Sequence, residues 1–462
     1  MRPEPGSAVQ KSLPAISPPP SQVQARLPRA IGYLGSTAIV VGTVIGSGIF
    51  LVPHNVAQYV GSVRSLLLVW IVGGVLSLAG ALSFAELGAA SPEAGGVYIY
   101  LRQAYGKLIA FLYGWGSLAV MESGAIATLA VAFSIYSARF YPLAAVERKL
   151  LAAGVIALLT FVNIVGVRKG AAVQVVFTCA KLAGLAIIIG FAFFSRHVAP
   201  VVSSFKLPTP QTTPSSFGVA LIGVLWAYQG WHILSYAAGE VKEPSKVLPR
   251  SFFLGTMLVV LVYLSANLAY LRVLPLPALV EHQRVAAKAM DVLAGPRGSA
   301  FVSALILCSI FGALNGNILG GARVCFAMAR DNLFFSSVGR VHPRFETPAL
   351  ALTIQGTWAM ALAASGTYEQ LYTYVIFTAW IFFGAATLGV IILRRRLPAL
   401  ERPYRTWGYP WVPLAFSLAA LGIVGNTLLT NGREAGIGLG LVLLGVPIYL
   451  AWRRWGRKPP LI

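Results

Sequence analysis

The sequence predicts an all-α protein that crosses a membrane many times, and two observations carry that prediction. Of the 462 residues, 57% are hydrophobic and only 11% are charged, whereas soluble domains carry about 25% charged residues. The charges lie in short clusters between apolar runs of about twenty residues, the length of helix that spans the hydrocarbon core of a bilayer. The soluble domains that the chain length alone would allow are therefore excluded.

Apolar runs between charged or proline-rich breaks predict twelve spans. In chain order they cover residues 33–59, 65–85, 107–138, 150–167, 171–195, 217–239, 252–274, 299–329, 348–365, 370–393, 410–430 and 435–452. Residues 1–30 are rich in Pro, Ser and Gln without an apolar core, which predicts a disordered tail and no signal peptide. With the N-terminus in the cytoplasm, the inner segments carry about twice as many Lys and Arg residues as the outer ones, so we expect both termini in the cytoplasm.

The net charge and the cysteines exclude further classes. Lys and Arg number 36 against 14 acidic residues, a net charge of +22. The basic residues follow the ends of apolar segments and do not alternate with aromatic residues on a polar face, so we expect no nucleic-acid binding. Cys179, Cys308 and Cys325 all lie in apolar runs, where a thiol acts as a small apolar filler, and no loop disulfide is predicted.

The first span reads TAIVVGTVIGSGIFLVP and has three glycines, Gly42, Gly46 and Gly48, near its middle. A GxxxG helix-packing face explains the first two. It does not explain Gly48 or the hydroxyl groups of Thr43 and Ser47, which weaken a helix and satisfy freed backbone groups. We therefore predict an unwound stretch beside a cavity at mid-membrane, where the N–H groups that begin the second half-helix attract an anion.

The sixth span contains a second interruption. Its sequence LIGVLWAYQGWHILSYAAGE carries Gly230 with the polar residues Gln229 and His232 at the middle. The first and sixth spans occupy matching positions in two halves of five helices each. Glycine-interrupted segments at matching positions are typical of the binding site in transporters built from inverted repeats, so the two interruptions predict such a site.

Three motifs carry a resemblance to a known family. They are GTVIGSGIF in the first span, FAELGAASPEAGGVYIYLRQAYG after the second and WAYQGW in the sixth. With them the chain resembles the amino acid–polyamine–organocation superfamily, and it looks most like a bacterial relative of the L-type amino acid transporters. The eighth span and its loop, NGNILGGARVCFAMARDNLFFSSVGRVHPRFETPALAL, match that family's small-residue helix and following loop.

The resemblance implies a LeuT-like fold. Its two inverted repeats of five helices would cover residues 31–195 and 217–393, followed by two helices within 410–452 and a basic tail at 453–462. The substrate would lie between the broken first and sixth helices. The residues that the resemblance places at the substrate are Thr43, Val44, Gly46, Ser47, Gly48, Trp226, Ala227, Gln229 and Gly230.

Within that site the resemblance implies a division of roles. The substrate carboxylate would meet the backbone N–H groups of Ser47 and Gly48, while its ammonium would meet carbonyl groups near Val44, Trp226 and Ala227. This division agrees with the electrostatic argument from the helix ends.

Three positions of the sixth span bear on the substrate side chain. Trp226 stands where the family places an aromatic gate. Gln229 stands where many relatives have Gly, and His232 where Asn is common. These two departures leave the identity of the substrate open.

Two charged residues lie inside predicted spans. Lys181 is deep in the fifth span, about ten residues from either end, where a charge costs several kcal/mol and marks a functional position. The resemblance implies that its ammonium stands where sodium-dependent relatives bind sodium, and we hypothesise that it stabilises the bent first helix or carries a proton. Glu122 in the third span is a secondary candidate, for which a proton site, a basic partner and a merely hydrogen-bonded acid all stay open.

Further charges near the predicted cytoplasmic face are Glu86, Glu93, Glu240, Lys242 and Glu243. A latch at an inner gate is one interpretation of these residues. For most of them we expect solvated surface charges instead, because exposed ion pairs contribute little.

The leading hypothesis is sodium-independent secondary transport of neutral amino acids by exchange. A proton-coupled permease for amino acids or amines is the alternative within transport, and a non-transporting amino acid sensor or a channel are alternatives outside it. Isolated polar residues in the spans make the channel the weakest of these. The sequence has no paired carboxylates, Cys/His metal spacing, nucleophile elbow or Walker lysine, so we expect no enzyme activity, catalytic residue, metal or cofactor.

The expected partners are an amino acid and the lipid bilayer of a bacterial inner membrane, whose anionic lipids the basic inner face would favour. Heteromeric animal members of the family bond a heavy chain through a cysteine after the third span. The corresponding segment, Ser137 to Lys149, has no cysteine, so no disulfide-linked heavy chain is expected.

Overall fold

The computed structural model describes residues 29–93, 95–165, 170–195, 212–345 and 347–455. Within these ranges every regular element is a helix, and the one β-type contact is an isolated parallel bridge between Ile31 and Val241. The predicted tails at residues 1–30 and 453–462 lie almost wholly outside the described residues. The all-α class is confirmed.

Ten helical segments of the described chain are long and apolar enough to cross a membrane. They cover Tyr33–Tyr59, Val63–Ala90, Lys107–Ser137, Ala145–Val165, Val175–Phe194, Pro244–Val273, Val285–Arg330, Tyr368–Arg396, Trp411–Thr430 and Gly432–Arg454. Two apolar helices, Pro214–Ala227 and Ala349–Ser365, are shorter. A multi-pass membrane protein is therefore confirmed, and the count of twelve spans stays a prediction.

In the first half of the chain, the described residues form eight α-helices and one π-helical turn. They are α1 (Tyr33–Val44), α2 (Gly48–Tyr59), α3 (Val63–Ala90), α4 (Val97–Tyr105), α5 (Lys107–Gly116), the π turn Ser117–Met121, α6 (Glu122–Ser137), α7 (Ala145–Val165) and α8 (Gly170–Phe194).

The part of the second half that the structure describes forms ten α-helices and one 3₁₀ turn. They are α9 (Pro214–Ala227), α10 (Ile233–Tyr236), the 3₁₀ turn Ala238–Glu240, α11 (Pro244–Val273), α12 (Leu276–Glu281), α13 (Val285–Arg330), α14 (Ala349–Ser365), α15 (Tyr368–Arg396), α16 (Trp411–Thr430), α17 (Gly432–Leu443) and α18 (Gly445–Trp455).

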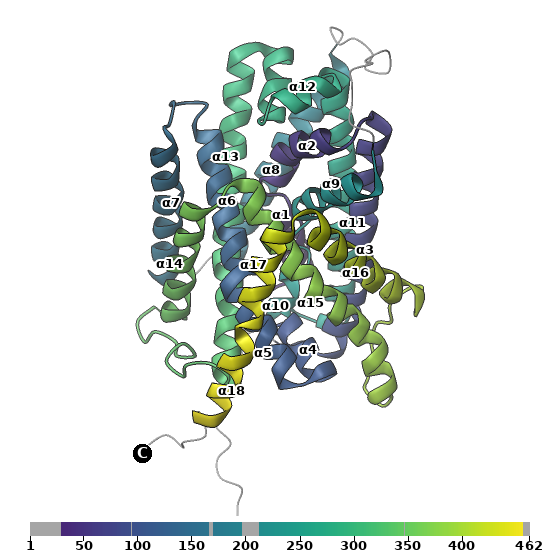
Figure 1. Ribbon diagram of the computed structural model, residues 1–462, viewed down its shortest axis with the longest axis vertical. Coiled ribbons are helices and arrows are strands. Elements are labelled where there is room, and N and C mark those ends of the chain that lie inside the picture. The colour runs from purple at the N-terminus through teal and green to yellow at the C-terminus, as the bar shows by residue number, and fades with distance from the viewer. Residues whose placement is uncertain (1–28, 94, 166–169, 196–211, 346, 456–462) are drawn as a thin grey trace, which may run out of the picture.

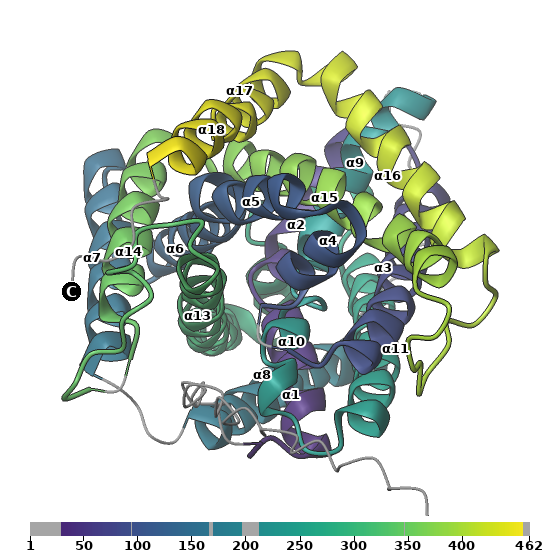
Figure 2. The same ribbon diagram turned by 90° about the horizontal axis from the view of Figure 1, so that it is seen from below.

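The long helices form a bundle along the vertical axis of Figure 1. We call the end that carries α12 the upper face and the end that carries α4 and the last turns of α18 the lower face. Figure 2 looks at the lower face and shows α2 and α10 among α3, α11, α13, α6 and α15, with α1 near α8 at the edge of this group. Most of α1 and α2 is buried, whereas α16 to α18 expose apolar side chains of the kind that face lipid.

Two predicted spans differ most from the observed helices. The run 299–329 is the last part of α13, which starts at Val285 and bends at Ala294 and Gly295, immediately before Pro296. The prediction began after this bend because Pro breaks a helix pattern. The run 217–239 is not one helix, since α9 ends at Ala227 and α10 begins at Ile233.

Candidate functional site

The first helix of the chain is interrupted at the predicted glycine cluster. α1 ends at Val44 and α2 begins at Gly48, with residues 45–47 outside both helices. A Cβ added to Gly48 would lie 2.4 Å from the Cα of Ala227, so only a glycine allows α2 to approach α9 this closely. The interruption is therefore packed directly against the end of α9.

The second interruption covers residues 228–232, between α9 and α10. Gly230 has φ +124°, a conformation that L side chains rarely adopt, and a Cβ there would lie 2.8 Å from the carbonyl carbon of Thr43. The Thr43 hydroxyl lies 3.1 Å from the Gly230 carbonyl oxygen and 2.6 Å from that of Ile39. The two interruptions thus contact each other, although they are far apart in sequence.

The carbonyl ends of α1 and α9 meet at one tyrosine. The hydroxyl of Tyr263 on α11 lies 2.9 Å from the Val44 carbonyl oxygen and 3.1 Å from that of Ala227. One O–H group donates a single proton and a carbonyl has two lone pairs, so these carbonyls keep acceptor capacity. Tyr263 could not be singled out beforehand, since an aromatic residue in an apolar span usually serves packing.

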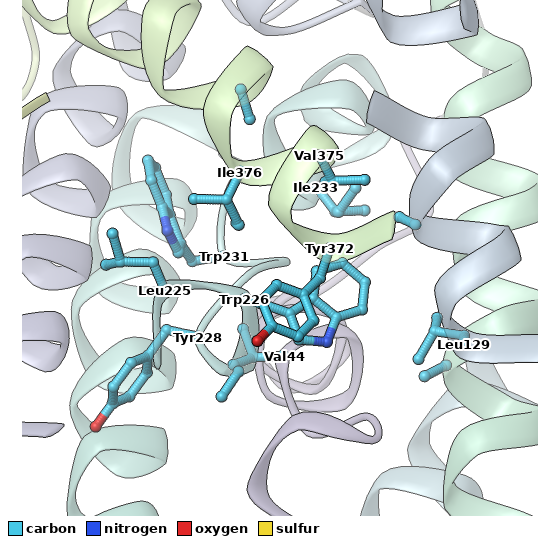
Figure 3. Close-up of a cluster of buried hydrophobic side chains, with 14 of the residues drawn as sticks. Val44, Leu129, Leu225, Trp226, Tyr228, Trp231, Ile233, Tyr372, Val375 and Ile376 are labelled. Carbon is cyan, nitrogen blue, oxygen red and sulfur yellow. The ribbon is translucent and has the colours of Figure 1, made fainter. Parts of the chain in front are cut away.

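The amide end of α2 faces a second tyrosine that sequence reasoning missed. The hydroxyl of Tyr368, at the start of α15, lies 3.1 Å from the Ser47 hydroxyl, and the indole N–H of Trp226 donates to it at 2.9 Å. Tyr372, one turn later, stacks on Trp226 with ring centroids 6.3 Å apart, as Figure 3 shows beside Val44. These aromatic rings cover the interruption on one side.

A small cavity lies between the two interruptions. Its lining comprises Thr43, Val44, Gly46, Ser47, Gly48, Trp226 and Gln229 from the predicted set, with Ala125, Leu129 and Asn317 in addition. Two predicted residues do not line it, because Ala227 packs on Gly48 and Gly230 packs on Thr43. No lining residue is charged, and α6 and α13 supply the residues that the sequence did not suggest.

Lys181 of α8 is buried beside the first interruption and outside the cavity. Its side chain is 4% exposed, and its ammonium donates to the Gly42 carbonyl at 2.8 Å. The Ser309 hydroxyl lies 3.4 Å from the Ile45 carbonyl oxygen on the same stretch. Lys181 therefore satisfies a carbonyl of the last turn of α1, as a support of the bent helix would.

Glu122 begins α6 directly after the π turn and is also buried outside the cavity. The Tyr236 hydroxyl donates to its Oε1 atom at 3.1 Å, and Nε2 of His232 lies 3.6 Å from the same atom. His232 thus faces Glu122 and does not line the cavity. Glu122 therefore has two partners, His232 of the second interruption and Tyr236 of α10.

Ion pairs and hydrogen bonds join the helices on both sides of the cavity. Toward the upper face, Glu369 of α15 accepts from the Tyr59 hydroxyl at 2.9 Å and from the Asn55 amide at 3.4 Å. Toward the lower face, Arg323 of α13 pairs with Glu240 at 3.0 Å. In the part of the chain that the structure describes, no cluster of three His, Cys, Asp or Glu side chains is suited to hold a metal ion.

Comparison with known proteins identifies the relatives of the chain. Residues 31–439 match a family described as amino acid permease. The serine/threonine exchanger SteT of Bacillus subtilis is 33% identical over 433 residues, which cover 93% of this chain and 98% of that protein. The b(0,+)-type amino acid transporter 1 of Mus musculus is 35% identical over 86% of this chain and 82% of its own. The cystine/glutamate transporter of Homo sapiens is 30% identical over 98% of this chain and 91% of that protein.

Proposed function

The chain belongs to the amino acid permease family of the amino acid–polyamine–organocation superfamily, and we propose that it exchanges neutral L-amino acids across the membrane by alternating access, without sodium. Amino acid transport is the activity named for the family and for its relatives, which include transporters and exchangers and no enzyme. The relatives are named for different substrates, among them serine and threonine, and cystine and glutamate. The class of substrate therefore has to be inferred from the residues of the site.

One observation supports an amino acid backbone as the ligand: helix ends of opposite polarity face one cavity. The N-terminal end of α2 at Ser47 and Gly48 supplies N–H groups, which attract a carboxylate. The C-terminal ends of α1 and α9, which contribute Val44 and Trp226 to the lining, supply carbonyl groups, which attract an ammonium. A zwitterion complements both ends at once.

The cavity lining supports a neutral side chain. All ten lining residues are uncharged, and the nearest buried ionisable groups, Lys181 and Glu122, lie outside it. A charged substrate side chain would be desolvated there without a partner, which costs several kcal/mol. Gln229 and Asn317 offer amide groups to a polar side chain.

The position of Lys181 supports sodium independence. Its ammonium meets the Gly42 carbonyl beside the first interruption, so a covalently attached cation already satisfies the backbone there. A sodium ion would serve the same purpose in a chain without this lysine.

Uptake of radiolabelled leucine, alanine and arginine into proteoliposomes without sodium tests the proposal. Vesicles are empty or preloaded with unlabelled amino acid, with or without an inward proton gradient. Uptake of leucine or alanine that requires preloaded substrate is the expected result. Failure of every amino acid to enter preloaded vesicles, with binding retained, would point to a sensor and overturn the proposal.

A proton-coupled permease is the second candidate, favoured by the buried pair of Glu122 and His232 and by Lys181. Uptake into empty vesicles driven by the proton gradient would select it.

The proposal also covers the domain organisation, the orientation and the partners of the chain. Residues 31–195 and 217–393 form two inverted repeats, and the helices within 410–452 follow them. Both termini lie in the cytoplasm of a bacterial cell, and no heavy chain is bonded through a disulfide.

A further inference from the structure

A cluster of buried polar side chains lies next to the cavity and belongs to neither the cavity nor the support at Lys181. Its centre is the carboxylate of Glu122, which is 5% exposed and contacts Tyr236 and His232. The hydroxyl of Tyr236 also bonds that of Tyr113 on α5. Cys325 lies one helical turn after Gly321 on α13, and a Cβ on Gly321 would lie 2.8 Å from the Cβ of Glu122.

The cluster continues the cavity toward the lower face along three elements. On α6, Glu122 precedes the lining residue Ala125 by three positions, so both lie on one face of the helix. On α13, the lining residue Asn317 is followed at four-residue steps by Gly321 and Cys325. After α9, the lining residue Gln229 is followed by His232 and then Tyr236.

The direction of these elements places the cluster below the cavity. In Figure 1, α5 leads upward into α6, while α10 lies below α9 and the last turns of α13 reach the lower face. Each of the three elements, α6, α13 and the segment after α9, therefore contributes one residue to the cavity. Each also contributes one residue to the cluster, about one turn nearer the lower face.

Several polar atoms around Glu122 are buried without a partner among the described residues. They include Nδ1 of His232, the hydroxyl of Ser123 and both amide atoms of Gln355. Gln355 belongs to the cluster, since a Cβ on Gly321 would lie 2.2 Å from its Nε2 and 2.8 Å from the Cβ of Glu122. Each such atom costs about 1–3 kcal/mol in a dry interior, so the arrangement is explained if water reaches these atoms in another conformation.

The helix that carries Glu122 is irregular at the same place. The turn Ser117–Met121 directly before it is π-helical, a feature that is frequent at functional sites. The opposing element, α10, has only four residues and is separated from α9 by turns. The Glu122 contacts therefore join the irregular part of one helix to a short helical segment of four residues.

We propose that the contacts of Glu122 with Tyr236 and His232 form the inner gate of the transport pathway. They hold α10 against α6, and their separation opens a hydrated route between α6, α10 and α13 from the cavity to the lower face. The inference rests on the proposed function, because a gate presupposes a route for the amino acid.

The buried thiol of Cys325 allows a direct test. Cys179 and Cys308 are exposed and are replaced by serine, which leaves Cys325 as the one thiol of the chain. The full-length protein is placed in vesicles, and a membrane-impermeant methanethiosulfonate is added to one side or the other without amino acid. In the parent protein we expect slow labelling, and only from the side of the lower face.

Two variants loosen the gate, and a third serves as the matched control. Tyr236→Phe removes one hydroxyl from the cluster and Glu122→Ala removes the carboxylate. We expect labelling of Cys325 from the lower face to accelerate about tenfold, since losing one to two hydrogen bonds shifts an equilibrium by about that factor. Tyr270→Phe removes a buried hydroxyl on α11 that has no hydrogen-bond partner among the described residues, and it should leave the labelling rate unchanged.

The outcomes separate the gate from the transport proposal. Unchanged labelling in both gate variants, or equal acceleration by Tyr270→Phe, would overturn the gate. Acceleration from the upper face as well would indicate general loosening and would also overturn it. If Glu122→Ala does not assemble, the conservative Tyr236→Phe variant still decides. A chain that labels as expected but moves no amino acid would keep the gate motion and contradict the proposed transport.

Discussion

Arg394 of α15 and Glu86 of α3 form a two-point ion pair, with Nε 2.8 Å from Oε1 and Nη2 2.7 Å from Oε2. The backbone N–H of Thr406 donates to the same carboxylate at 2.7 Å, and the Arg394 guanidinium lies over the ring of Tyr409. The Glu86 side chain is 2% exposed. Glu86 is thus an exception to the expectation that most of these charges are solvated, because the segment after α15 folds back over it.

Breaking this pair should destabilise the protein. Glu86→Ala leaves Arg394 and the Thr406 N–H without their acceptor, and removing one partner of a buried pair costs about 3–5 kcal/mol. We expect a clearly lower Tm in detergent by differential scanning fluorimetry. Glu243→Ala is the control, since its pair with Lys246 is exposed and contributes less than about 1 kcal/mol. Equal Tm values for the two variants would show that Glu86 is not a structural anchor.

Gly48→Ala should abolish transport. The added Cβ would meet the Cα of Ala227 at 2.4 Å, so the half-helix α2 would have to move away from α9 and the cavity between them would change. Exchange of labelled alanine should fall by at least about tenfold, the effect of some 1.4 kcal/mol. Gly190→Ala on α8 has no atom within 4 Å of its Cβ, and normal exchange by that variant would show that the loss is local.

Lys181→Met should impair exchange while the protein still reaches the membrane. The change keeps the length of the side chain and removes its charged donor to Gly42, and a hydrogen bond from a charged group contributes about 1.5–3 kcal/mol. We expect at least about a tenfold lower rate of alanine exchange. Lys288→Met, at a half-exposed lysine that pairs with Asp291, is the control.

The pH profile of the same variant separates two roles of Lys181. A structural support lowers the rate equally at every pH, whereas a proton carrier also gives the wild type a pH dependence that the variant lacks. If Lys181→Met changes neither uptake nor its pH dependence, both roles are discarded.

Tyr368→Phe should weaken substrate binding more than it slows turnover. Its hydroxyl accepts from Trp226 and contacts Ser47, where we place the substrate carboxylate, so the variant leaves the indole N–H unpaired. A loss of about 1 kcal/mol corresponds to roughly a fivefold higher KM for exchange. Tyr374→Phe, on the same helix and only half-buried, should leave KM unchanged. A lower kcat at constant KM would assign Tyr368 to the gating step instead.

Local backbone chemistry explains how much of the site could be predicted. Gly42, Gly46 and Gly48 weaken a helix wherever they stand, and Gly230 permits a positive φ, so both interruptions were predicted close to where the helices end. The helical class follows from composition, because a long apolar segment has to satisfy its own backbone. The start of α13 was missed, because Pro296 breaks the helix pattern of the sequence.

The sequence by itself determined the number and kind of apolar runs, the two helix interruptions and the presence of two buried charges. Only the tertiary structure decided that Lys181 meets Gly42, that Glu122 meets Tyr236 and His232, and that Tyr368 and Asn317 adjoin the cavity. The physical reason is the distance along the sequence between the residues that interact. A residue's effect on its own backbone is read from its neighbours in the chain, whereas these contacts join residues more than a hundred positions apart, and packing of the whole bundle selects them.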